Sequence, residues 1–311
     1  MRMKNLSILF LFIAFIACKE VPPPINYEAS KKLKDTTYTI SSIPIPQAKN
    51  VLIEDISGVQ CVNCPDAAVI SKQLMDANPD RVFSIVAHPN LPALKALVEP
   101  INKEGHKSKY DFRTGDAVKI IQMMGVPGSL PSGYINRKLF TGETSRILGR
   151  AKWANYTNTE LPTATQVNID LHNEFNSSTN KGVISIKATY TSAVNKKQFI
   201  TIALIEDSLI DVQEYSDPIT FEVKFNPDYV HMHVLRDVIT YATGDPLSES
   251  DITIEAGRVF EKEYAYDLKI DDPTNNEIFN VVPKNAKLIV FIHEDTPDLN
   301  ILQVKEIAVV E

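Results

Sequence analysis

The 311-residue sequence has only three cysteines and a single tryptophan. Three cysteines are too few for a disulfide-rich scaffold or for a zinc site with four thiolate ligands. Positive charge is also in the minority, because 32 lysines and arginines face 39 aspartates and glutamates and give a formal net charge of -7. With no long basic run in the chain, this acidic balance argues against nucleic acid as a partner.

Long apolar runs and nucleotide-binding motifs are absent as well. After residue 17 no stretch has 18 consecutive apolar residues, so we expect no transmembrane helix in the mature chain. The sequence has no Gly-x-Ser-x-Gly nucleophile elbow, no phosphate-binding loop and no dinucleotide fingerprint. It therefore gives no support to common hydrolase or nucleotide-dependent enzymes, and we expect no cofactor.

The first 17 residues resemble an export signal. Arg2 and Lys4 precede an apolar run at residues 6–17, which is too short to span a bilayer. Residues 15–18, Phe-Ile-Ala-Cys, resemble a bacterial lipobox, although Phe15 departs from the usual leucine. We expect residues 1–17 to be a lipoprotein signal peptide and Cys18 to carry palmitate and the other lipid chains. An ordinary signal peptide is the alternative.

A polar, proline-containing segment at residues 18–47 is predicted to be a lipidated tether. Lys19 follows the predicted lipidation site, where an aspartate would favour retention at the inner membrane. We therefore expect the chain to be anchored by its lipid in the outer membrane, on either the periplasmic or the cell-surface face.

Two unlike halves follow the tether. At residues 48–160, strand patterns at 51–56, 81–87 and 132–136 alternate with helix patterns at 65–77, 111–124 and 145–157, which predicts an α/β layer. At residues 161–311 apolar residues alternate with a period of two between turn-rich stretches. This second pattern predicts an all-β antiparallel sandwich, immunoglobulin-like or jelly-roll-like.

Cys61 and Cys64 form a Cys-x-x-Cys motif between a predicted strand and a predicted helix, which is the context of a thioredoxin-like redox site. Free N–H groups at a helix start favour a thiolate. Cys61 would then attack a substrate disulfide, and Cys64, one helical turn later, would resolve the mixed disulfide. A static disulfide in an oxidising compartment and a metal site are the alternatives.

Two further residues match positions of the thioredoxin site. Asp55 lies six residues before Cys61, where thioredoxins have a buried acid that assists the resolving cysteine. Glu54 is its competitor, because neighbours in a strand face opposite sides. Pro131 precedes a predicted strand, where thioredoxin-like proteins have a cis-proline, and Pro127 is the alternative.

Three segments resemble one family. Residues 53–65 around the cysteine pair, 130–137 around Pro131 and 229–236 in the second half are similar to the outer-membrane-protein-28-related lipoproteins of Gram-negative bacteria. The resemblance runs from about residue 37 to the C-terminus. It implies a thioredoxin-like domain followed by a β-sandwich on a lipid-anchored protein, and it implies no substrate. Thioredoxins have an aromatic residue where this chain has Gln60, so their substrate docking and redox potential do not carry over.

Three histidines are candidate site residues. His88 follows the second predicted strand, and we expect it to be a loop residue satisfied by the backbone. His231 and His233 would lie on one face of a strand, where a pair could bind a metal. No third ligand is visible, so we expect structural hydrogen bonds and no metal site.

Two functions fit these observations. In the first, the chain is a thiol-disulfide oxidoreductase acting on exported or envelope proteins, with Cys61 attacking, Cys64 resolving, Asp55 transferring protons and Pro131 positioning the substrate backbone. In the second, it is a non-catalytic binding or assembly module of the cell envelope, and the disulfide is static. The sequence does not choose between an enzyme and a module.

Overall fold

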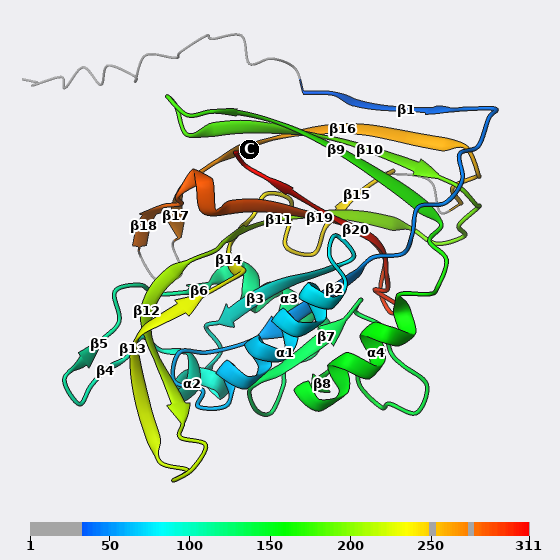
Figure 1. The fold of residues 1–311 in the computed structure, drawn as a ribbon. Coiled ribbons are helices and arrows are strands. Elements are labelled where there is room, and N and C mark those ends of the chain that lie inside the picture. Colours follow the sequence, from blue (N-terminus) through cyan, green and yellow to red (C-terminus); the bar gives the residue numbers. More distant parts are fainter. Residues whose placement is uncertain (1–32, 249–252, 273–276, 311) are drawn as a thin grey trace, which may run out of the picture. The chain divides into compact units, whose positions relative to one another are not determined.

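Strands dominate the computed structural model of the chain (Figure 1). The structure describes residues 33–248, 253–272 and 277–310. The predicted signal peptide, the lipidation site Cys18 and the first part of the predicted tether lie outside these residues. In the described part, no helix has the length and apolar character needed to cross a membrane.

A four-stranded antiparallel sheet contains an unexpected strand. Its order is β1-β16-β10-β9, and β1 (Asp35–Thr39) pairs along its whole length with β16 (Arg258–Asp267). These five residues belong to the segment predicted as a tether. Their threonines and tyrosine favour extended backbone, and β16 offers a free edge, so they form an edge strand instead. The other two strands are β10 (Lys181–Tyr190) and β9 (Val167–Asn176).

A second, mixed sheet contains strands from both predicted halves of the chain. Its order is β20-β19-β11-β14-β3-β2-β7-β8, with β15 beside β11 and β6 beside β3. The two halves are joined within this sheet by the parallel pairing of β14 with β3. Val234 of β14 is the register partner of Val86 in β3, and the Val86 N–H donates to the His233 carbonyl at 2.8 Å. The strands are β2 (Val51–Ile56), β3 (Val82–Pro89), β6 (Arg113–Thr114), β7 (Ser132–Ile135), β8 (Leu148–Gly149), β11 (Gln198–Glu206), β14 (Val234–Val238), β15 (Asp245–Pro246), β19 (Ala286–Glu294) and β20 (Ile301–Ala308).

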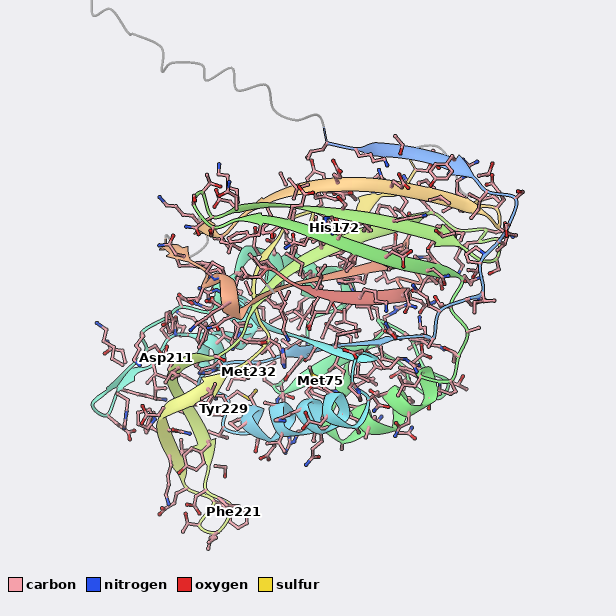
Figure 2. All side chains as sticks on the ribbon, turned by 45° about the horizontal axis from the view of Figure 1, so that its top comes forward. Met75, His172, Asp211, Phe221, Tyr229 and Met232 are labelled. Carbon is pink, nitrogen blue, oxygen red and sulfur yellow. A yellow bond between two sulfur atoms is a disulfide. The ribbon has the colours of Figure 1, made fainter. Side chains whose placement is uncertain are left out.

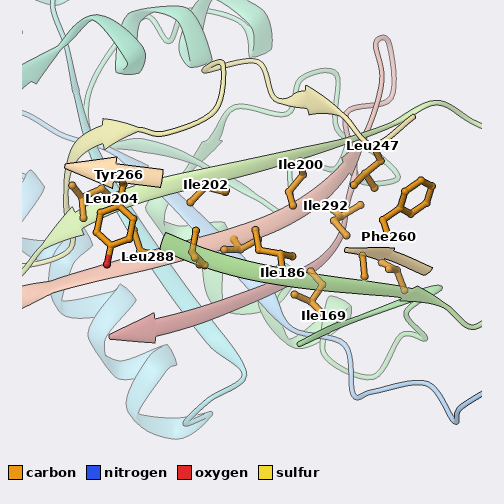
Figure 3. Packing of buried hydrophobic residues seen from close by; sticks show 14 of the residues in the cluster. Ile169, Ile186, Ile200, Ile202, Leu204, Leu247, Phe260, Tyr266, Leu288 and Ile292 are labelled. Atoms are coloured by element: carbon orange, nitrogen blue, oxygen red, sulfur yellow. The ribbon is translucent and has the colours of Figure 1, made fainter. Parts of the chain in front are cut away.

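The mixed sheet is buried on both faces where it crosses between the halves. In β11, Ile200, Ile202 and Leu204 pack against the four-stranded sheet (Figure 3), whereas Ala203 and Ile205 pack on the opposite side against residues of β3. Side chains alternate between the two faces of a strand, so one strand contributes to two cores. The two sheets therefore pack face to face, but they are not built from residues 161–311 alone as predicted, since the mixed sheet includes strands of the first half and the four-stranded sheet includes β1.

Helices cover both faces of the β2–β3 region. On one face α1 (Cys64–Ala77) packs with Ile53 and Val82, and α4 (Trp153–Glu160) contributes the fully buried Trp153 to the same cluster. On the other face α3 (Gly115–Met124) places Ala117 beside alternate residues of β3. The predicted strand–helix–strand order is confirmed for β2, α1 and β3.

Two predicted helices begin later than expected. The helix predicted from residue 111 starts at Gly115, because the Thr114 side chain caps it by accepting a hydrogen bond from the Ala117 N–H at 3.1 Å. The helix predicted from residue 145 starts as an α-helix at Trp153. Leu148 before it pairs with Gly133 of β7, which keeps the backbone extended.

Short elements complete the described chain. They are the 3₁₀ turns η1 (Pro92–Leu94), η2 (Arg150–Lys152) and η3 (Pro283–Asn285), the helix α2 (Lys95–Val98), and the paired strands β4 (Asn102–Lys103) with β5 (His106–Lys107), β12 (Leu209–Ser216) with β13 (Val223–His231), and β17 (Lys269–Asp272) with β18 (Glu277–Asn280).

A buried lysine near the start of the described chain contacts the last strand, β20. The Lys49 ammonium is 5% exposed and donates to the carbonyl oxygens of Ile301 and Leu302 at 2.5 and 2.6 Å. Next to it the Asn50 N–H donates to the Gln303 side chain at 2.9 Å. Strand β20 therefore holds the segment that leads into β2.

Candidate functional site

Cys61 and Cys64 are joined by a disulfide, with their Cα atoms 5.4 Å apart. The loop before the helix folds locally, since the Cys61 N–H donates to the Gly58 carbonyl and the Cys64 N–H to the Cys61 carbonyl, both at 3.0 Å. Cys64 opens α1, and Pro65 occupies its first turn, where a missing N–H does no harm. The sequence thus places the pair at the start of a helix, as expected.

A hairpin from the second half of the chain covers this disulfide loop. Strand β12 donates two backbone hydrogen bonds to it, from Glu214 to the Val59 carbonyl at 2.9 Å and from Ser216 to the Val62 carbonyl at 3.1 Å. The two cysteines are only 2% and 3% exposed. A substrate can therefore reach the Cys61 sulfur only if part of this region moves, whereas Cys64 also lines a cavity described below.

The base of the hairpin is held by charges and by a small apolar cluster. Glu214 forms an ion pair with Lys103 at 2.7 Å, and the Asp211 carboxylate accepts from the backbone N–H groups of Lys109 and Tyr110 at 3.0 Å. Leu209 and Val212 of β12 pack with Val59, Ile101, Phe112 and Val234. The hairpin is therefore a fixed part of the fold at its base.

Asp55 and Glu54 face opposite sides of β2, and the structure separates their roles. Glu54 forms a two-point ion pair with the fully buried Arg137, with N–O distances of 2.9 and 2.7 Å. The Arg137 guanidinium also lies 4.7 Å from the centre of the Phe291 ring. Asp55 is 1% exposed, and its Oδ1 has no hydrogen-bond partner among the described residues. Asp55 is thus the unpaired buried acid, and burial raises its pKa to about 8.

Asp55 and Cys64 line one cavity of about 450 Å³. The opposite wall comes from the segment that resembled the family in the second half, including Tyr229 and Met232, with Met75 of α1 nearby (Figure 2). Burial and the Asp55 carboxyl raise the pKa of Tyr229 to about 12. The structure therefore brings the acid, the second cysteine and a distant sequence motif to one place.

The histidines differ from the sequence expectations. His88 is not a loop residue: it belongs to β3, is 2% exposed, and its Nδ1 has no partner among the described residues. His231 ends β13, but His233 has a φ of 58° and pairs with Asp207 at 3.0 Å. The left-handed backbone at His233 breaks the strand, so the two histidines do not share a strand face.

An aromatic row connects two of these histidines behind the disulfide loop. The ring of Phe112 lies 5.4 Å from His88 and 4.7 Å from His231, measured between centroids. Burial lowers the pKa of His231 to about 4. Burial, His231 and Arg236 lower the pKa of His88 to about 3, so both rings are neutral at pH 7. In the described part of the chain no group of three or more His, Cys, Asp or Glu side chains is arranged to hold a metal.

Pro131 lies at the same end of β2 as the disulfide loop. The Leu130–Pro131 peptide bond is cis, as the sequence predicted for Pro131 rather than Pro127. Ser132 after it pairs with Ile56, the last residue of β2, and Leu130 belongs to the apolar cluster that contains both cysteines.

Sequence reasoning missed Gln213 and Tyr229 in the second half, and it named His231 only as a possible metal ligand. Gln213 donates to the carbonyl oxygens of Gly58 and Cys61 at 3.2 Å each. Tyr229 and His231 complete the wall of the cavity. The sequence signals in this half were the family-like motif at residues 229–236 and the spacing of its two histidines, and neither indicates a position beside Cys64.

Comparison with known proteins identifies a family and a shared fold. The model of the family described as "Outer membrane protein Omp28" matches residues 119–311, more than half of the chain. The solved structure of HBP35 of Porphyromonas gingivalis has a TM-score of 0.58 at 16% identity and covers 84% of this chain and 75% of its own. A structural-genomics structure from Agrobacterium tumefaciens has a TM-score of 0.47 at 11% identity, over 86% of this chain and 97% of its own.

A search of curated proteins gives no match. The similarity to HBP35 shows a shared fold, and the match to the family model shows membership of a family. An outer-membrane family indicates a location in the cell envelope. The chain therefore belongs to the outer membrane protein Omp28 family.

Proposed function

We propose that this envelope protein exchanges thiols and disulfides with exported proteins through Cys61 and Cys64 in a thioredoxin-like site. The observation that supports this most is the unpaired, buried Asp55 carboxyl, which lines the same cavity as Cys64. A static disulfide does not need such a group, and burying it without a partner costs stability. Because burial raises the pKa of Asp55 to about 8, this acid gains or loses a proton near neutral pH.

The bonds and electrons of the exchange pass only between the two cysteines and the substrate disulfide. In the reduced protein, the Cys61 thiolate attacks one sulfur of a substrate disulfide, and the other substrate sulfur leaves as a thiolate. Asp55 accepts the proton of the Cys64 thiol, and the resulting thiolate attacks the Cys61 sulfur. The protein disulfide forms, the second substrate thiolate leaves, and two electrons have passed to the substrate. An external dithiol must then reduce the protein again.

A non-catalytic envelope module is the second candidate function. The observation that favours it is that Cys61 and Cys64 are 2% and 3% exposed beneath the β12–β13 hairpin. In such a module the disulfide fixes the start of α1 and the surface of the fold contacts a partner. The two candidates differ in whether the hairpin opens on the timescale of a reaction.

The deciding experiment measures dithiothreitol-dependent reduction of insulin by the wild-type chain and three variants. We expect Cys61→Ser to abolish the activity and Cys64→Ser to accumulate a mixed disulfide visible by mass spectrometry. The Cys61→Ser/Cys64→Ser double variant sets the background. If the wild-type rate is no higher than this background, thiol-disulfide exchange is rejected and the non-catalytic module is the remaining candidate. A pull-down in mild detergent tests the module directly, because its partners remain bound to the double variant.

We also propose that Cys18 carries the lipid that attaches the chain to the outer membrane. The support is the Phe-Ile-Ala-Cys sequence at residues 15–18, where the apolar run of residues 6–17 ends at the cysteine. A Cys18→Ala variant should leave the membrane fraction and lose labelling by a palmitate analogue. Protease treatment of intact cells would then identify the face, since only a surface-exposed chain is digested.

A further inference from the structure

The cavity beside Cys64 is lined mostly by residues other than the cysteine. It is bounded by α1 on one side, by β2 and β3 at its floor, and by the segment that joins β13 to β14 on the other side. Its volume of about 450 Å³ lies within the range of roughly 300–1,000 Å³ that is usual for small-molecule sites.

Buried polar groups without partners gather around this cavity. Asp55 Oδ1, Ser71 Oγ, Ser84 Oγ and His231 Nε2 have no hydrogen-bond partner among the described residues, and all four side chains line the cavity. They are 1%, 4%, 0% and 5% exposed. Each unpaired group costs about 1–3 kcal/mol, and native proteins leave few of them. A molecule that offers hydrogen-bonding atoms here would recover part of that cost.

The walls above these groups are apolar. Val86 and Val234 lie on the inner side, and Met75, Val69 and Met232 lie nearer the opening, where Val69 is 55% and Met232 40% exposed. Methionine adapts its shape to an irregular ligand, so this wall suits a hydrocarbon or ring system. The occupant therefore has an apolar body as well as a polar end.

The charges at the opening are already paired with each other. Lys72 forms an ion pair with Asp76 at 2.6 Å, and Lys287 pairs with Asp207 at 3.3 Å. Inside, burial holds Asp55 and His231 mostly neutral at pH 7, since the pKa values are about 8 and about 4. A charged ligand would enter without a counter-charge, which is costly in a buried site.

We propose that this cavity binds a small, uncharged molecule with an apolar ring or chain and a hydroxyl or carbonyl oxygen that hydrogen-bonds to Ser71, Ser84 and His231. The binding uses neither sulfur atom, so it does not depend on thiol-disulfide exchange. Asp55 is the fourth group at the polar end and can donate its proton to the ligand oxygen.

The test uses three probes with one ring and different charge: cyclohexanol, cyclohexanecarboxylate and cyclohexylamine, at pH 7. The full chain in mild detergent carries ¹³C-methyl methionine, and the methyl resonances are assigned with Met75→Leu and Met232→Leu. We expect cyclohexanol to shift the Met75 and Met232 resonances in a saturable way. Met123 and Met124, which do not line the cavity, are internal controls and should not move. The charged probes should bind at least about tenfold more weakly.

Two variants locate the binding. Ser84→Ala removes a hydroxyl that has no partner among the described residues, so the variant should fold and should bind cyclohexanol about fivefold more weakly. Ala68→Leu narrows the cavity and should abolish the shifts, whereas Ser178→Ala in an exposed turn should change nothing.

The inference is overturned if no probe gives a saturable shift, which means that water alone fills the cavity. It is also overturned if Met123 and Met124 shift together with Met75 and Met232, or if the charged probes bind as well as cyclohexanol. The Cys61→Ser/Cys64→Ser variant should retain the shifts. If insulin reduction fails while those shifts persist, exchange is rejected and the ligand site stands.

Discussion

The Gln213 side-chain amide donates a hydrogen bond to the main-chain carbonyl of Cys61 at 3.2 Å. This contact joins a strand near residue 210 to the first cysteine of the motif. The same amide also donates to the carbonyl oxygens of Gly58 and Glu214 at 3.2 and 3.0 Å. This side chain therefore adds to the backbone hydrogen bonds from Glu214 and Ser216 that hold the hairpin on the disulfide loop.

Gln213→Ala should make the disulfide easier to reduce. The change removes the amide donors that bind the Gly58 and Cys61 carbonyl oxygens, and each such bond contributes about 0.5–1.5 kcal/mol, so the open hairpin becomes more populated. We expect the rate of reduction by a water-soluble phosphine to rise about five- to tenfold. Released thiols are counted over time, with Gln166→Ala, a change at a half-buried glutamine outside the hairpin, as the matched control. Equal rates in the two variants would mean that the hairpin does not limit access.

Removing the disulfide should cost a modest amount of stability. A loop closed between residues three apart restricts the unfolded chain only a little, which the chain-entropy model puts at about 2 kcal/mol. The Cys61→Ala/Cys64→Ala variant should therefore lose about that much free energy of unfolding in a urea titration. Dithiothreitol should lower the stability of the wild type by a similar amount and leave the double variant unchanged. A loss above about 4 kcal/mol would show that the bridge supports much more than its own loop.

Asp55→Asn should change how stability depends on pH. Burial raises the pKa of Asp55 from 3.8 to about 8, so between these values the folded protein binds a proton that the unfolded chain releases. The contribution of Asp55 to stability is thus fully present below about pH 4 and declines by up to about 1.4 kcal/mol per pH unit as the pH rises towards 8. The asparagine has no such dependence.

Relative to wild type, Asp55→Asn should become progressively more stable as the pH rises from 5 to 8. Taking the difference between the two proteins cancels the buried histidines, whose lowered pKa values act with the opposite sign. Urea titrations at four pH values give this difference. A constant difference across the range would show that Asp55 is not held as a neutral acid.

Glu54→Gln should be strongly destabilising. The change leaves the Arg137 guanidinium, which is fully buried, without its carboxylate, and breaking a buried pair in this way costs about 3–5 kcal/mol. The exposed pair between Lys72 and Asp76 provides the control, because Asp76→Asn should cost no more than about 0.5 kcal/mol. If the two losses in a urea titration are similar, the buried pair contributes no more than a surface one.

Local features of the first half followed from sequence, since they depend on neighbours along the chain. A short apolar run at residues 51–56 predicted β2, the helix pattern at residues 65–77 predicted α1, and the cysteine spacing predicted the pair that the disulfide joins. The choice of Asp55 over Glu54 needed the fold, because only Arg137, brought beside Glu54, shows which acid is paired.

The hairpin over the disulfide could not be predicted in the same way. Its contacts with Val59 and Cys61 connect residues more than 150 positions apart, as in the Gln213 hydrogen bonds, and no local pattern records them. The cavity has a weak signal in the sequence. Ser84 in β3 and Asp55 in β2 are polar residues at buried strand positions, where apolar residues are expected. Such exceptions are the sequence signal of a site, although they do not reveal what faces it.

The acceptors of the buried Lys49 ammonium lie 252 and 253 positions later, on β20. Because the ribosome makes the chain from its N-terminus, the acceptors of the Lys49 ammonium exist only after almost the entire protein has been synthesised. During that interval the Lys49 ammonium lacks these two acceptors, and the β12–β13 hairpin has not yet been made when the cysteines emerge. The disulfide that ends up beneath the hairpin is therefore formed, we expect, while the chain is still open to the enzymes and oxidants of its compartment.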